Sequence, residues 1–197
     1  MSELSRAVAA LQSQFSDKIQ SHNVFREEDT LMVKSKDLIE ILAFCKSTLG
    51  FEMLLDISSV DHFEQEPRFE MVYELYSLEH ADHLRIKCAL LEDEEAPTAT
   101  GIWRTADWHE REVFDMMGIR FTDHPDLRRI LMWEGYPYYP LRKEFPLEGK
   151  PSEMPDVAFT GVAPLEGGPF VTAPTTDTTV KREPRARHPE PAPRRDA

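Results

Sequence analysis

Apolar residues recur in the first part of the chain at spacings of three and four positions, the period of an amphipathic helix. This pattern predicts one helix over residues 3–15 and another over residues 36–49. The apolar faces consist of Leu4, Val8, Leu11 and Phe15 in the first helix and of Leu38, Ile41, Leu42 and Cys45 in the second. Ser35 is expected to cap the start of the second helix, and Gly50 to end it.

Strand-like patterns, in which apolar residues alternate or run together, lie on both sides of the second helix. They predict strands over residues 19–25, 31–33, 51–61, 69–78 and 83–91. Short turns join the last three strands, so these are expected to be antiparallel neighbours. The third strand, residues 51–61, is continuous and apolar enough to be expected at the centre of the sheet. The order α-β-β-α-β-β-β, followed by one more helix, predicts a two-layer α+β fold in which helices cover a mixed or antiparallel sheet.

The segment 108–147 combines charged and aromatic residues with too many apolar ones for a solvated tail. Its first part is predicted to be a helix. Asp107 and Glu110 have the spacing of a capping box at the start of this helix, and Arg111 and Asp115 are placed to form an ion pair one turn apart. So many charges need partners, which belong either to the same domain, as an internal salt-bridge network, or to another molecule.

Gly118 is placed to end this helix in the left-handed conformation that glycine adopts readily. A strand-like step at 119–121 and a turn at 123–126 follow it. His124, directly before Pro125, is predicted to be a turn residue that hydrogen-bonds the backbone or a neighbouring acid.

Two stretches of this segment carry a resemblance to a known family. Residues 110–119, EREVFDMMGI, and 121–131, FTDHPDLRRIL, closely resemble the signature of the C subunit of respiratory complex I, the NADH-quinone oxidoreductase. Residues 134–137 and 140–147 resemble the family's ending, with one departure: Tyr138-Tyr139-Pro140 extends a Gly-(Tyr/His)-Pro-Leu-Arg-Lys pattern. The signature residues in this chain are Glu110, Arg111, Glu112, Asp115, Gly118, His124, Pro125, Asp126, Arg128, Arg129 and Arg142.

The resemblance implies the same two-layer fold and a structural role in a proton-pumping enzyme. It implies that this chain holds no cofactor, and that NADH, FMN, the iron–sulfur clusters and quinone are bound by other subunits of the assembly. The chain is expected to buttress the quinone-site D subunit, as a peripheral protein at the cytoplasmic face of the inner membrane. The signature charges are expected to hold the fold together and to hold the partner to it. Related membrane-bound hydrogenases and coenzyme F420H2 dehydrogenases have a similar signature and remain alternatives.

Other chemistry is poorly supported by the sequence. A zinc protease needs His-Glu-x-x-His, but His109-Glu110 is followed by Val113 where the second histidine would stand. There are no paired Glu-x-x-His motifs for a di-iron site, and no glycine-rich nucleotide-binding motif occurs. A free-standing hydrolase using the carboxylates of residues 109–126 is the remaining enzyme alternative, although no nucleophile–base spacing accompanies them.

Net charge, the length of the apolar runs and the number of cysteines indicate which partners and which cellular compartment suit this chain. The net charge of −13 argues against nucleic acid or an anionic membrane surface as a partner, since both attract basic proteins. No run of apolar residues is long enough to predict a transmembrane segment. Cys45 and Cys88 have no partners at metal-ligand spacing and are predicted to be buried thiols, not linked to each other, in a reducing compartment.

Residues 148–197 differ in composition from the predicted domain of residues 1–147. They are rich in proline and lack any helical or alternating period, so an extended tail is expected, with residues 181–197 disordered in isolation. The spaced apolar residues of the tail are expected to anchor it on a partner: Val157, Phe159, Phe170 and Val171.

Overall fold

The computed structural model describes residues 5–133 and 135–147 of the chain. Three α-helices occur in these ranges: α1 (Arg6–Phe15), α2 (Leu38–Ser47) and α3 (Ala106–Met117). Five strands form the main sheet: β1 (Ile19–Phe25), β2 (Glu28–Val33), β3 (Met53–Asp61), β4 (Phe69–Ser77) and β5 (Asp82–Leu90). Two short strands, β6 (Ala96–Pro97) and β7 (Phe121–Thr122), pair in parallel beside it, and a 3₁₀ turn, η1 (Ser35–Asp37), leads into α2. The predicted α+β fold and element order are confirmed.

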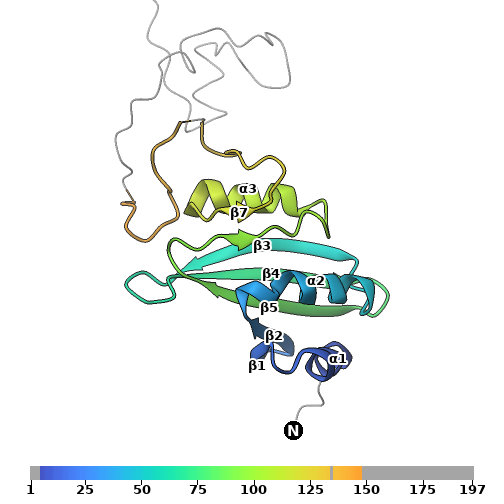
Figure 1. Cartoon of the computed structure of the whole chain (residues 1–197). Coiled ribbons are helices and arrows are strands. Elements are labelled where there is room, and N and C mark those ends of the chain that lie inside the picture. Colours follow the sequence, from blue (N-terminus) through green and yellow to red (C-terminus); the bar gives the residue numbers. More distant parts are fainter. Residues whose placement is uncertain (1–4, 134, 148–197) are drawn as a thin grey trace, which may run out of the picture. The chain divides into compact units, whose positions relative to one another are not determined.

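The main sheet is mixed, with the strand order β1-β2-β5-β4-β3 (Figure 1). The pairs β3–β4 and β4–β5 are antiparallel, as the short turns predicted, and β1 also pairs with β2 in the antiparallel sense. Between β2 and β5 the pairing is parallel, because the chain leaves β2 through α2 and two further strands before returning beside it. This pairing makes β5 the central strand.

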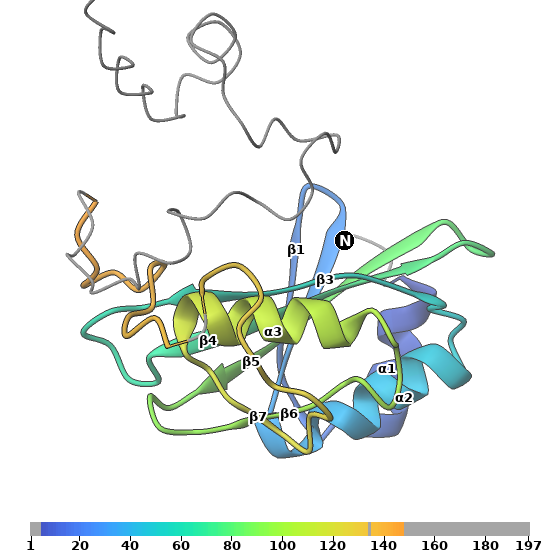
Figure 2. The ribbon, with the colours of Figure 1, turned by 90° about the horizontal axis from the view of Figure 1, so that it is seen from above.

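One sequence prediction about the sheet is wrong: β3 is an edge strand and does not lie at the centre. Leu54 and Ile57 are buried in the core, but Met53, Leu55 and Val60 are each about 40% exposed. β3 has α3 beside it (Figures 1 and 2), and Asp56, Ser58 and Ser59 interrupt its apolar residues, so it lacks the continuous apolar pattern of a strand buried on both faces.

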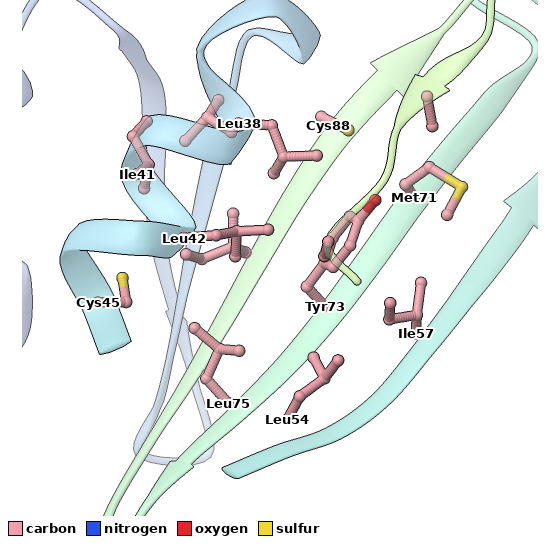
Figure 3. Packing of buried hydrophobic residues seen from close by; sticks show 14 of the residues in the cluster. Leu38, Ile41, Leu42, Cys45, Leu54, Ile57, Met71, Tyr73, Leu75 and Cys88 are labelled. Carbon is pink, nitrogen blue, oxygen red and sulfur yellow. The ribbon is translucent and has the colours of Figure 1, made fainter. Parts of the chain in front are cut away.

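The core lies between the sheet and the helices on one of its faces. Leu42 of α2 points towards Tyr73 of β4 (Figure 3), and Leu38, Ile41 and Cys88 belong to the same buried cluster. The apolar faces predicted from spacing are confirmed for both helices, with Leu4 outside the described residues. Because alternating residues of β4 and β5 face this core, their other neighbours form a charged outer face on which Arg85 pairs with Glu74 and Lys87 with Glu70.

The two cysteines are buried free thiols on separate elements of the core, as predicted. Burial raises the pKa of Cys45 and that of Cys88 to about 12, because a thiolate would lose its hydration there. Both side chains therefore act as small apolar core residues.

The ends of α1 and α2 can be compared with the capping residues predicted from the local sequence. Ser5 caps α1, since its hydroxyl accepts a hydrogen bond from the amide of Val8 at 3.4 Å. Ser35 does not cap α2, contrary to the prediction: a 3₁₀ turn precedes the helix, and the Ser35 hydroxyl donates to Glu94 at 2.8 Å. Gly50 follows α2 with a φ of 77°, as expected of a glycine that ends a helix.

Candidate functional site

The signature residues lie on α3 and on the loop that follows β7. Figure 2 shows this loop, coloured yellow to orange, running back alongside α3. The left-handed Gly118, with a φ of 78°, ends α3 as predicted and turns the chain towards β7. Most residues of α3 are buried, because β3 lies on one side of the helix and the loop on the other.

Asp115 is the fully buried centre of this arrangement. Its Oδ1 accepts a hydrogen bond from Nη1 of Arg129 at 2.5 Å, and its Oδ2 accepts from the backbone amides of residues 130, 131 and 132 at 2.7–3.0 Å. Burial alone would raise the pKa of Asp115, but these four donors hold it below its ordinary value. The carboxylate thus fixes a turn of the loop through charge and hydrogen bonds together.

Arg129 extends the same network to the next part of the chain. Its Nη2 donates to the carbonyl oxygens of Tyr136 at 2.7 Å and Tyr138 at 3.3 Å. Its guanidinium also lies 5.2 Å from the ring centroid of Tyr139. Arg129 therefore connects α3, the loop and the aromatic residues beyond it.

The predicted ion pair between Arg111 and Asp115 is wrong. Arg111 points to the loop, where it donates to the carbonyl oxygens of Arg128 at 3.2 Å and Arg129 at 3.3 Å. The spacing allowed the helical pair, but Arg129 offers Asp115 a better partner because the guanidinium and three amides converge on one carboxylate.

A second network fixes residues 139–144 against the sheet. Arg142 donates from Nε to the carbonyl oxygen of Met117 at 2.7 Å, and its guanidinium lies 4.7 Å from the ring centroid of Tyr139. Next to it, Arg68 binds both oxygens of buried Asp61, at 3.0 and 3.1 Å, and Asp61 also accepts the amide of Lys143 at 2.9 Å. Arg68 and Asp61 were not singled out from the sequence, although pairing of the predicted strands 51–61 and 69–78 places them together at one end.

A third cluster lies at the start of α3 and includes Glu110 and His124, whose side chains are both fully buried. The predicted capping box is wrong: Glu110 accepts hydrogen bonds from the hydroxyl of Thr98 and the amide of Ala99, each at 2.6 Å. His124 behaves as predicted, because its Nε2 lies 3.3 Å from a carboxylate oxygen of Asp107 and 3.4 Å from that residue's carbonyl oxygen. Burial raises the pKa of Glu110 to about 7, and Asp107 adds to this, against the effect of the two hydrogen bonds.

The remaining signature residues face outwards. Glu112, Pro125, Asp126 and Arg128 are exposed, and the last two pair with each other at 2.8 Å. Two large apolar side chains of the same segments, Trp108 on α3 and Leu131 on the loop, are about 60% exposed. Arg111 connects the two, since it lies 5.2 Å from the ring centroid of Trp108 and hydrogen-bonds the loop near Leu131. We call this set the exposed strip: Trp108, Glu112, Pro125, Asp126, Arg128 and Leu131.

Two general properties of the described ranges bear on chemistry. They contain no group of three or more His, Cys, Asp or Glu side chains arranged to hold a metal ion. None of the helices in the same ranges combines the length and apolar character needed to cross a bilayer. The site is thus a set of carboxylates and guanidiniums with internal partners, bordered by the exposed strip. The tail anchors Val157, Phe159, Phe170 and Val171 lie outside the described residues.

The family model and the similar proteins found by comparison all belong to one family. Residues 31–151 match the family described as "Respiratory-chain NADH dehydrogenase, 30 Kd subunit". The chain is 44% identical over 160 residues to the NADH-quinone oxidoreductase C subunit numbered 2 of Rhizobium etli, covering 80% of this chain and 86% of the relative. It is 42% identical over 154 residues to the NADH-quinone oxidoreductase C subunit of Geotalea uraniireducens, covering 78% and 94%.

A solved structure shows the same fold. The chain resembles a component of the membrane-bound sulfane sulfur reductase, an archaeal respiratory membrane complex, with a TM-score of 0.62 and 25% identity over 71% of this chain and 84% of that one. Together with the family match, which covers residues 31–151, these relatives identify the chain as a member of the family of NADH-quinone oxidoreductase C subunits, the 30 kDa subunit of respiratory complex I.

Proposed function

We propose that this chain is a cofactor-free structural subunit of the peripheral arm of a proton-pumping NADH-quinone oxidoreductase, where it buttresses the quinone-site subunit. The observation that supports the proposal most strongly is that the signature residues fall into two groups, one with partners inside the chain and one that faces solvent. Asp115, Arg129 and Arg142 are used inside the chain, whereas Asp126 and Arg128 face solvent together. The inner group makes a rigid support, and the outer group is available to a partner.

The exposed strip has properties that suit a protein contact. Trp108 is held by Arg111, which is itself fixed by two carbonyl oxygens of the loop. An aromatic side chain that is already ordered loses little entropy on binding, and tryptophan and arginine are frequent at the centres of interfaces. Glu112 and Arg128 would set the orientation of the partner more than the affinity.

In this proposal NADH, FMN, the iron–sulfur clusters and quinone are held by other subunits, and the chain is peripheral at the cytoplasmic face of the inner membrane. The internal use of two signature carboxylates, Asp115 and Glu110, supports a structural role over a free-standing hydrolase. Asp115 is saturated by four donors, and Glu110 lies fully buried between α3 and Thr98. Neither carboxylate faces solvent, where a substrate would have to bind.

The solved relative supports a second candidate. Because that chain belongs to a sulfane sulfur reductase, the same fold serves a membrane complex with a different activity. The equivalent position in a related membrane-bound hydrogenase or F420H2 dehydrogenase is therefore the alternative. The subunits that co-purify with the full-length chain after mild detergent extraction distinguish the two: a flavin-containing NADH-oxidising module supports the first, and a hydrogenase module the second.

Charge reversal at matched positions tests the contact surface. Arg128 and Arg120 are both about 70% exposed and each pairs with one acid, but only Arg128 belongs to the exposed strip. Arg128→Glu is expected to reduce recovery of the quinone-site subunit with the tagged chain at least tenfold, while its melting temperature stays within about 2 °C of wild type. Arg120→Glu is the control and should retain that partner. Equal recovery with both variants would exclude the proposed surface.

The tail is proposed to add further contacts through Val157, Phe159, Phe170 and Val171. Truncation after Val180 should leave assembly nearly intact. Truncation after Leu147 should weaken binding to the quinone-site subunit while the remaining residues keep the thermal transition of the full-length chain. Full binding by the shorter chain would exclude an anchoring role for the tail.

A further inference from the structure

Three segments that are distant in the sequence meet around Glu110. The carboxylate accepts the hydroxyl of Thr98 and the amide of Ala99, both at 2.6 Å, from the segment after β6. The third segment is the loop after β7, whose His124 places Nε2 at 3.8 Å from Oε2 of Glu110. The same Nε2 lies 3.3 Å from a carboxylate oxygen of Asp107, one turn earlier on α3. One imidazole thus faces two carboxylates.

The hydrogen bonds of His124 determine which nitrogen carries its proton. Nδ1 accepts the backbone amide of Asp126 at 3.0 Å, so it carries no hydrogen, and the proton resides on Nε2. An imidazolium would direct an Nδ1–H group against that amide. The imidazole therefore supplies one donor for two acids and no positive charge.

Other groups around Glu110 do not neutralise it either. Tyr73 of β4 is fully buried nearby, and burial raises its pKa well above the ordinary value, so its phenol stays uncharged. Arg111, the next residue of α3, points to the carbonyl oxygens of residues 128 and 129. Asp107 adds a negative charge, in keeping with the pKa of Glu110 being raised to about 7, chiefly by burial.

We propose that Glu110 and His124 form a proton-controlled clasp between α3 and the loop of residues 123–126. When Glu110 is protonated, its carboxyl group is neutral and His124 donates from Nε2 to the carbonyl oxygen of Asp107, 3.4 Å away. When Glu110 releases its proton to water, the new carboxylate attracts Nε2–H of His124 across the present 3.8 Å, and the ring and its loop move towards α3.

The moving loop leads into the exposed strip, because Asp126 both donates its amide to His124 and pairs with Arg128. Protonation of a buried acid is in this way connected to the surface that the proposed function assigns to the partner. Regulation of partner binding rests on that proposed function. The clasp itself does not, since it is a property of the isolated chain.

Nuclear magnetic resonance of the full-length chain tests the clasp directly. The side-chain carboxyl carbon of Glu110 is expected to titrate with a midpoint near pH 7, and the amide resonances of residues 123–126 should shift with the same midpoint. A Glu110 midpoint near the ordinary glutamate value, or loop shifts with a different midpoint, would overturn the proposal.

Glu110→Gln provides a neutral isostere of the protonated state. Its carboxamide oxygen can accept the Ala99 amide, and its NH₂ group can donate to Thr98, whose hydroxyl then turns to Thr100, 2.9 Å away. The loop of this variant should keep the acid-form resonances of the wild type at every pH. The control is His109→Gln, which removes the partly exposed imidazole that pairs with Asp56 and should leave the loop titration unchanged.

Loop shifts that persist in a folded Glu110→Gln variant would overturn the clasp. If that variant does not fold, the agreement or disagreement of the two wild-type midpoints decides the question alone. Recovery of the quinone-site subunit is a separate measurement. A clasp that titrates in a chain that never recovers this partner would refute the proposed function only, and normal assembly without the titration would refute the clasp only.

Discussion

Asp115 and Arg129 lie 14 residues apart in the sequence and form an ion pair in the interior, with 2.5 Å between Oδ1 and Nη1. The pair joins α3 to the loop that returns alongside it. Because the same carboxylate accepts three backbone amides, the loop has a defined conformation without secondary structure of its own.

Asp115→Asn is expected to destabilise the chain by about 3–5 kcal/mol, because it leaves the guanidinium of Arg129 without its buried counter-charge. Urea unfolding followed by circular dichroism measures the change. Asp126→Asn is the matched control: Asp126 also pairs with an arginine, but both side chains are more than half exposed, so a change within about 0.5 kcal/mol is expected. Similar losses in the two variants would contradict the assignment of Asp115 as the centre of the network.

Stability is expected to fall in acid. Burial by itself would raise the pKa values of Asp61 and Asp115, but Arg68 in the first case and backbone amides with Arg129 in the second hold both below the ordinary value. An unfolded aspartate titrates at about 3.9. The contribution of these groups is therefore complete above that pH and is lost as the pH falls through their folded pKa values.

Urea unfolding of the full-length chain over a pH series from neutrality into acid measures this dependence. The free energy of unfolding should decline in the acid range for the wild type, and the decline should be smaller in Asp115→Asn. An identical acid slope in the two proteins would show that the loss of stability arises at other groups.

Gly118→Ala should be more destabilising than Gly135→Ala, although both glycines have a positive φ, 78° and 87°. A Cβ at Gly118 would lie 2.6–2.8 Å from the ring of Tyr139, whereas nothing lies within 4 Å of one at Gly135. Both variants carry the backbone strain of roughly 1–2 kcal/mol, and only the first must also displace the ring that lies beside Arg142 and Arg129. Thermal unfolding of the two variants separates these effects, and equal melting temperatures would mean that Tyr139 adjusts freely.

The family and most elements could be recognised from the sequence, because both depend on residues that are close together along the chain. Helix α2 buries the face its spacing predicted, and Gly118 ends α3 in the predicted conformation. The predictions failed where a residue distant in the sequence offered a side chain a different partner from the one that local spacing suggested. Ser35 had the right position for a cap, but Glu94, 59 residues later, binds its hydroxyl.

Local sequence was sufficient for the alternation of helices and strands, the residues that face the core and the burial of both cysteines, since hydrophobic periodicity selects an element and its inner face. Long-range packing was needed to set the strand order, with β5 central and β3 at the edge, and the partner of each charge. Asp115 has Arg111 at helical spacing yet pairs with Arg129, and Glu110 binds Thr98 and Ala99 where a cap was predicted. The physical reason is that a charge pairs with the donors that packing brings nearest, and those come from segments whose proximity no local spacing records.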